Sequence, residues 1–167
     1  LYHSTQNPSF ISGVWTNDAN GNWSDTNNWS SGVIANGTSR MADFSTINMS
    51  ADRTVTLDGA RTVGGLRFGD LIGSQNWFLS GASTLTLDGG GVNVPLITVN
   101  QNTATISSPL AGTNGLAKSG NGTLVLNAAN NLGGGLVVNA GSVNINGGAT
   151  TFGSGTSTIG YLTGNGN

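Results

Sequence analysis

Acidic side chains are the first candidates for catalysis, and all seven are aspartates because the chain contains no Glu. Glycoside hydrolysis commonly uses two carboxyl groups about 5 to 10 Å apart. Asp58 and Asp88 are the candidate pair, since each follows a β-type segment, but Asp-Gly dipeptides such as theirs are typical of turns. The single His, His3, lies near the start of the chain. We therefore predict no catalytic residues and no enzyme activity.

A possible metal loop lies further along the N-terminal region. Asp18, Asn20 and Asn22 have the alternating spacing of a calcium-binding loop. That signature also needs Gly at its sixth position and Glu at its twelfth, where this chain has Trp23 and Trp29. An Asn- and Gly-rich loop accounts for the same residues. We predict no metal site and no cofactor.

Aromatic side chains are the candidates for ligand binding, because a flat ring packs against the apolar face of a sugar. The predicted carbohydrate-binding residues are Trp15, Trp23, Trp77, Phe78 and Arg67. Side-chain alternation along a strand at 77–80 turns Trp77 inward and Phe78 outward, with Arg67 placed near Phe78. The alternative for the tryptophans at 15, 23 and 29 is a hydrophobic cap that closes one end of the fold.

Short β-type segments repeat along the chain and must position these residues. One set starts at Thr54, Thr84, Thr103, Thr123 and Ser142, and a second starts at Trp77, Leu96, Leu116 and Leu136. Apart from the longer first interval, from Thr54 to Thr84, both sets keep a period of about 20 residues, which is typical of a solenoid. Each turn of a solenoid adds one strand spacing of about 4.8 Å. We predict an all-β, right-handed parallel β-helix.

The repeat also predicts how the chain is divided and where side chains point. Residues 1–50 are expected to form a Trp-rich N-terminal cap region and residues 51–167 the rungs, with an extra strand at 63–68 in the long first interval. In each segment of the first set, the second and fourth residues should face the interior and Thr should face solvent. Polar residues that follow these segments should form a turn ladder: Asp58, Asp88, Ser107, Asn127 and Asn146.

Composition narrows the functional class. Only 7% of the 167 residues are charged, the net charge is −2 and the pI is near 4.8, so nucleic-acid binding has no electrostatic basis. No apolar run is long enough for a membrane span, and Cys is absent. Abundant Gly, Asn, Ser and Thr fit many turns between short strands. We expect a secreted, extracellular protein, with any signal peptide outside this sequence.

The segment from Gly115 to Val143 resembles the autotransporter-associated β-strand repeat. Its characteristic part is Lys118-Ser-Gly-Asn-Gly-Thr-Leu-Val-Leu126, followed by the Gly-rich turn 133–135. Upstream, Asn22-Trp23-Ser24-Asp25 and Thr62-Val-Gly-Gly-Leu-Arg-Phe-Gly69 are also similar to these proteins. The resemblance implies a β-helical stack. The chain is in addition similar to a family of xylan-binding carbohydrate-binding modules that are attached to xylanases.

Two functions follow from these resemblances. The first is a monomeric, non-catalytic carbohydrate-binding module that recognises plant cell-wall polysaccharide, with xylan as the first candidate, and targets an attached glycoside hydrolase. The second is a structural surface protein or adhesin stalk, similar to an autotransporter passenger. A catalytic β-helix is a third and less favoured possibility, because its only candidate acids, Asp58 and Asp88, both lie in turn dipeptides.

Overall fold

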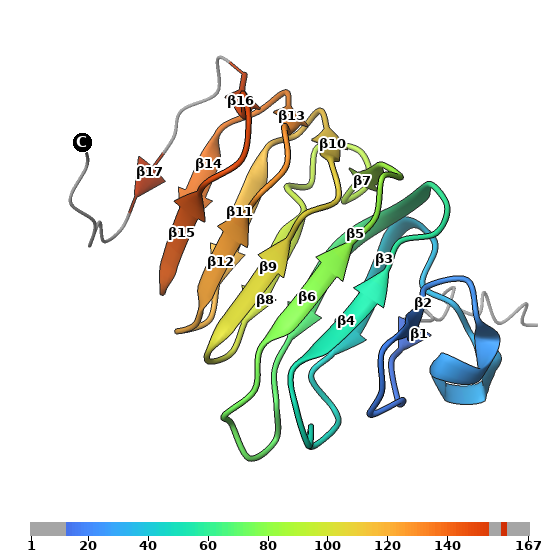
Figure 1. Cartoon of the computed structure of the whole chain (residues 1–167). Coiled ribbons are helices and arrows are strands. Elements are labelled where there is room, and N and C mark those ends of the chain that lie inside the picture. Colours follow the sequence, from blue (N-terminus) through green and yellow to red (C-terminus); the bar gives the residue numbers. More distant parts are fainter. Residues whose placement is uncertain (1–12, 154–157, 160–167) are drawn as a thin grey trace, which may run out of the picture.

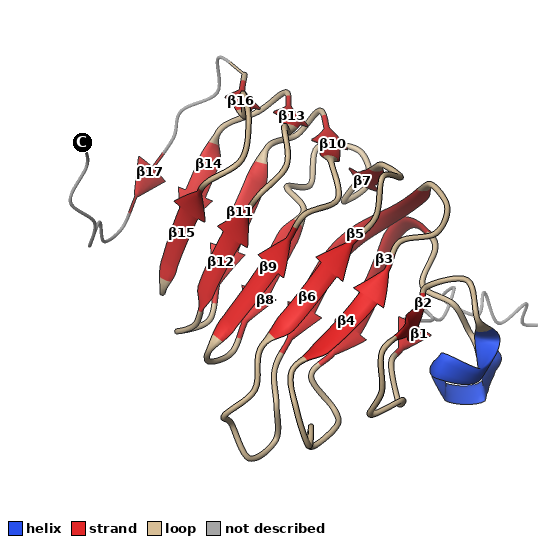
Figure 2. Cartoon of the chain, in the orientation of Figure 1, coloured by secondary structure: helices blue, strands red, loops and turns tan. Residues whose placement is uncertain are grey.

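The computed structural model describes residues 13–153 and 158–159, and nearly all the regular structure in this part of the chain is parallel β-strand. Figure 1 shows strands of successive turns lying side by side along the length of the molecule, and Figure 2 shows helical turns at one end. The fold is a parallel β-solenoid of about five turns, which confirms the predicted fold class.

Two sheets form the walls of the solenoid. The six-stranded sheet, here called the small sheet, contains β2 (Gly21–Asn22), β4 (Arg53–Thr56), β6 (Trp77–Ser80), β9 (Thr103–Ile106), β12 (Thr123–Leu126) and β15 (Ser142–Ile145). The eleven-stranded sheet, here called the large sheet, contains β1 (Gly13–Val14), β3 (Gly37–Phe44), β5 (Arg61–Phe68), β7 (Leu85–Leu87), β8 (Leu96–Val99), β10 (Leu110–Gly112), β11 (Leu116–Ser119), β13 (Asn131–Leu132), β14 (Leu136–Val138), β16 (Thr151–Phe152) and β17 (Thr158–Ile159).

Each turn passes once through the small sheet and then through the large sheet. β5 crosses the large sheet as one long strand, whose first part pairs with β7 and whose second part pairs with β8. In later turns the same crossing is made by two shorter strands, such as β10 followed by β11. The extra strand predicted at 63–68 is confirmed as the greater part of β5.

The register corrects the two predicted sets of segments. Thr54 on β4 pairs with Phe78 on β6, not with the segment that begins at Thr84, because β7 belongs to the large sheet. The segment at Trp77 therefore belongs to the first set and the one at Thr84 does not. Register partners are further apart in the sequence early in the stack, from Arg53 to Trp77, than late in it, from Thr123 to Ser142. Because the loops of the early turns are longer, the spacing in the sequence did not show which segments pair.

The interior is filled by the inward residues of both sheets. Alternation is clearest in β9 and β12, where Ala104, Ile106, Leu124 and Leu126 are all buried. These side chains belong to one continuous hydrophobic cluster that includes residues from Trp15 to Val138. Hydrophobic burial along this cluster is the main stabilising contribution, because the chain has few charges and no disulfide. At the far end, Ile145 on β15 is in register with the buried Leu126 and so keeps the predicted inward position, but it is 46% exposed.

The predicted turn ladder is only partly present. Ser107, Asn127 and Asn146 follow β9, β12 and β15, and their backbone N–H groups donate to the carbonyls of Leu79, Ile106 and Leu126 on the preceding turns. Asp88 follows β7 in the large sheet and lies outside this series. The carboxylate of Asp58 accepts hydrogen bonds from Ser24 instead of joining the ladder. The two Asp-Gly dipeptides resemble each other in sequence but occupy different corners.

Candidate functional site

Three of the five predicted binding residues are tryptophans, and all three are buried. Trp15 and Trp23 are 0% exposed and lie with Trp29 around Phe44, with ring centroids 5.2 to 5.7 Å apart. Their indole N–H groups donate to backbone carbonyls: Trp15 to Asn17 at 2.7 Å and Trp23 to Ala35 at 2.9 Å. These rings present no face to a sugar. They form the hydrophobic cap that was the alternative interpretation.

Trp77 on β6 is also a core residue. It is 2% exposed, its ring lies 5.5 Å from that of Phe44, and its indole N–H donates to the Gly69 carbonyl at 2.7 Å. Side-chain alternation along β6 predicts that Trp77 points inward, and the structure confirms that orientation. A ring that points into the core cannot contact a polysaccharide. The position of Trp77 therefore conflicts with its predicted role in carbohydrate binding.

Phe78 and Arg67 do reach the surface, but on different sheets. Phe78 faces outward from the small sheet and is 36% exposed. Arg67 is exposed on β5 of the large sheet, where its guanidinium lies 3.4 Å from the Asp43 carboxylate. The structure therefore does not assemble the predicted residues into one site. Their separation could not be predicted before β5 and β6 were assigned to different sheets.

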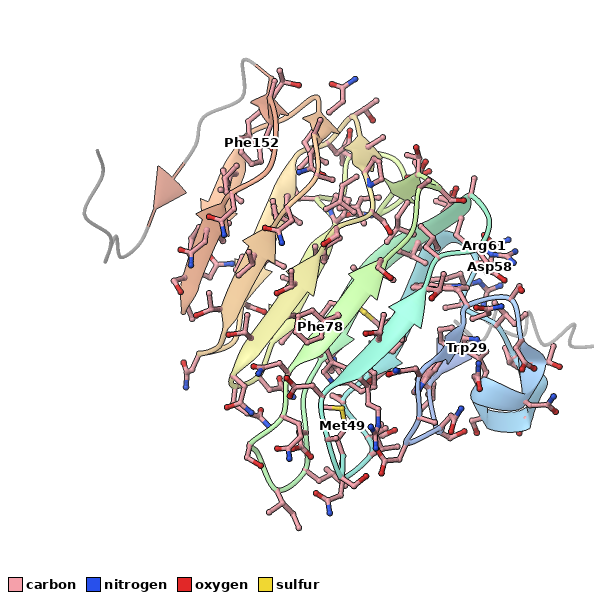
Figure 3. The ribbon with its side chains drawn as sticks, in the orientation of Figure 1. Trp29, Met49, Asp58, Arg61, Phe78 and Phe152 are labelled. Atoms are coloured by element: carbon pink, nitrogen blue, oxygen red, sulfur yellow. The ribbon has the colours of Figure 1, made fainter. Side chains whose placement is uncertain are left out.

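The outer face of the small sheet around Phe78 is polar but uncharged. The register places Thr54 and Thr105 on either side of Phe78, and Val125 and Asn144 continue the same row on β12 and β15. Figure 3 shows Phe78 on this face, away from the helical end that carries Trp29. The row offers one aromatic ring flanked by a hydroxyl group on each side. Of the aromatic residues predicted to bind a glycan, Phe78 is the one whose ring reaches the surface in the part of the chain that the structure describes.

Asp58 and Asp88, the two candidate acids, hold loops at different corners of the solenoid. Asp58 accepts from Ser24, and although burial works to raise its pKa, the bonds from Ser24 hold that pKa below its ordinary value. At Asp88, bonds from the Gly90 backbone and the Thr38 hydroxyl lower the pKa of the carboxyl group. Both carboxyl groups are therefore ionised at neutral pH, and neither is suited to act as a general acid.

The residues of the possible calcium loop bind the neighbouring turn. Asp18 forms an ion pair with Arg53 at 2.7 Å, and that contact lowers the pKa of Asp18. Asn20 accepts from the Thr54 backbone N–H at 2.8 Å. In residues 13–153 and 158–159, no three His, Cys, Asp or Glu side chains are grouped closely enough to hold a metal ion. This loop fastens the cap region to the first turns of the solenoid.

A shallow groove on the large sheet was not predicted from the sequence. It has a volume of about 380 Å³, and it is lined by Ala111 and Gly112 together with Thr86, Asp88 and Asn131. None of the predicted binding residues lines it. The signal that could have located it is Ala111, a small residue whose register partners on the adjacent strands are Thr86 and Asn131.

Comparisons with known proteins favour the second of the two functions considered. The chain is 38% identical, over 134 residues, to a protein of Brucella suis biovar 1 (strain 1330) named "Adhesin BmaC autotransporter". The match covers 80% of this chain but only 4% of that adhesin. No protein-family model and no solved structure matches the chain. The xylan-binding resemblance gains no support from these comparisons.

Proposed function

We propose that this chain is a structural segment of the surface-exposed passenger of an autotransporter adhesin. Its role is to extend the passenger as a stiff solenoid, and it performs no catalysis. The observation that carries the proposal is the continuous stack of parallel strands from β2 to β15, whose interior is one unbroken hydrophobic cluster. In such a fold, length and stiffness come from the addition of near-equivalent turns.

Two further features support a spacer role. The similarity to the Brucella adhesin covers most of this chain but a small part of that protein, as expected if the matched region is one stretch of a long stack. The carboxylates of Asp18, Asp58 and Asp88 accept hydrogen bonds from backbone N–H groups and so hold loops of the stack. No helix in the described part of the chain is long and apolar enough to cross a membrane. An extracellular location follows from the proposal.

Deletion of one complete turn tests the proposal in the parent passenger. Thr123 and Ser142 are register partners on successive turns, so removal of residues 123–141 lets β15 take the place of β12 against β9. A spacer should tolerate this change, and the shortened passenger should still appear on the cell surface with its adhesion retained. The matched control removes residues 123–132, which ends inside the turn and breaks the register of every later strand.

The two deletions give opposite expectations. The complete-turn deletion should show surface labelling and protease resistance close to those of the unaltered passenger, while the control should lose both. If the complete-turn deletion abolishes adhesion while surface labelling and protease resistance stay normal, this segment itself contacts the adhesion target, and the spacer proposal is wrong.

A carbohydrate-binding role for the small sheet is the second candidate, and the exposure of Phe78 favours it. An aromatic ring between Thr54 and Thr105 could pack against a sugar while the hydroxyl groups form hydrogen bonds. Affinity electrophoresis of the chain on xylan, glucan and mannan tests this role, with Phe78→Ala and Val125→Ala compared side by side. Retardation that is lost in Phe78→Ala alone would support the role, and no retardation on any glycan would rule it out.

A further inference from the structure

The only Lys in the chain is buried in the interior of the solenoid. Lys118 is on β11, is 0% exposed and points inward at a position that Ile97 occupies on the preceding turn. A buried ammonium group needs partners, because removing a charge from water is costly. No ion pair to Lys118 forms among residues 13–153 and 158–159, and the last acidic residue in the sequence is Asp88.

Backbone carbonyl groups supply the partners. The Lys118 Nζ donates to the carbonyls of Ser119 at 2.7 Å, Gly120 at 2.8 Å and Gly122 at 3.0 Å, which belong to the corner that leads into β12. It also donates to the Ala140 carbonyl at 3.2 Å, which belongs to the equivalent corner of the next turn. The ammonium group therefore bridges two successive turns of the solenoid.

Both glycines of the Lys-x-Gly-x-Gly motif, Gly120 and Gly122, lie in a tight corner. A Cβ atom at Gly122 would lie 2.7 Å from the Val99 side chain and 2.8 Å from the Asn102 carbonyl oxygen. Gly120 has a φ of 77°, and a Cβ atom there would collide with the Val99 carbonyl. Gly141, on the next turn, has a φ of 69°, and a Cβ atom would lie 2.9 Å from the Lys118 Nζ and still closer to the Gly122 carbonyl. Glycine is required at positions 120 and 141 so that four carbonyl oxygens can converge on one nitrogen.

We propose that the Lys118 ammonium acts as an internal cation that locks the corners of two successive turns together. The carbonyl oxygens of residues 119, 120, 122 and 140 form a ready-made cation site, and the protonated side chain fills it. The lock acts between turns and is independent of whether the chain serves as a spacer or binds a glycan. It fixes the register at a point where the strands themselves are short, as in β11 and β14.

Replacement of the ammonium group tests the lock. Lys118→Met keeps an apolar stem but removes all donors, and Ile97→Met is the matched control at the same inward position one turn earlier. Amide exchange should accelerate by roughly tenfold or more at Gly122 and Ser142 in Lys118→Met. The amide of Leu57, which donates to Ser80 far from this corner, should be unaffected. Equal effects of the two substitutions on the corner amides would overturn the proposal.

A measurement on the unaltered chain covers the case in which Lys118→Met does not fold. Because Lys118 is the only Lys, acetylation of a side-chain amine reports on this residue alone. The folded chain should acetylate at Lys118 at least about a hundredfold more slowly than the chain in denaturant, since reaction requires the corner to open. Acetylation at the denatured rate would show that the ammonium group is accessible and that the lock does not exist.

Discussion

Individual side chains in this protein serve mainly to join one turn to the next. Asp18 and Asn20 reach the backbone of residues 50 and 54, and Asn76 accepts from Thr103. Polar atoms are used in this way because each corner leaves backbone N–H and C=O groups without strand partners. The sequence reveals the residue types needed for such contacts, but it does not reveal which corner each one reaches.

The titration of Lys118 gives a prediction at this scale. Burial lowers the pKa of Lys118 from 10.5 to about 8 in the folded chain. Between these values the unfolded chain binds more protons than the folded chain, so the free energy of unfolding should rise as the pH increases from 8 to 10.5. The free energy of unfolding of the unaltered chain, minus that of Lys118→Met, should increase by at most about 3 kcal/mol over this range. Below pH 8 this difference between the two proteins should not change with pH.

Denaturant unfolding of both proteins at a series of pH values measures this difference. Subtraction of the Lys118→Met curve removes the contributions of other groups that titrate in the same range. A difference that stays constant or shrinks as the pH rises through this range would mean that the ammonium group is not desolvated as the structure indicates.

At the scale of strands and turns, the sequence predicted the later part of the solenoid better than the earlier part. From β9 onward successive turns are nearly equal in length, and the alternation places Leu124 and Leu126 correctly in the core. Before β9 the loops at 69–76 and 88–95 lengthen the turns, and the segments at 77 and 84 look alike although they belong to different sheets. Hydrophobic alternation identifies a strand but not its partner.

The tight corner between β11 and β12 gives a prediction at the element scale. Gly120→Ala should destabilise the chain by about 2 kcal/mol or more, because a side chain is strained at its positive φ and collides with the Val99 carbonyl. Gly59→Ala is the matched control, since no atom lies within 4 Å of its added Cβ. It should change stability by less than about 0.5 kcal/mol.

Thermal and denaturant unfolding of the two variants checks this expectation. If both alanine substitutions have equally small effects, the corner is looser than the structure shows, and the requirement for glycine in the Lys-x-Gly-x-Gly motif fails with it.

For the whole molecule, the features that could be predicted follow from the sequence repeat. Those that could not be predicted lie in the N-terminal region, where the sequence does not repeat. The parallel β-solenoid and the Trp-rich cap could be inferred from spacing and composition. The predicted binding residues could not be placed correctly, because Trp15 and Trp23 lie among Asn and Asp in the sequence yet pack around Phe44 in the core. A polar sequence context does not expose a ring when the backbone turns it inward.

A set of spin-label distances tests the central claim, that this chain is a continuous stack whose length grows by one strand spacing per turn. Labels at Thr54, Thr105 and Asn144 all face outward in one row of the small sheet, on strands β4, β9 and β15. Thr105 is two strands from Thr54 and Asn144 is four, so the backbone separations should be about 10 Å and about 19 Å. Pulsed dipolar spectroscopy should show a Thr54–Asn144 distance that exceeds the Thr54–Thr105 distance by about 9 Å, and both distance distributions should be narrow. Broad distributions, or a Thr54–Asn144 distance no longer than that of Thr54–Thr105, would contradict the stacked solenoid and the spacer function built on it.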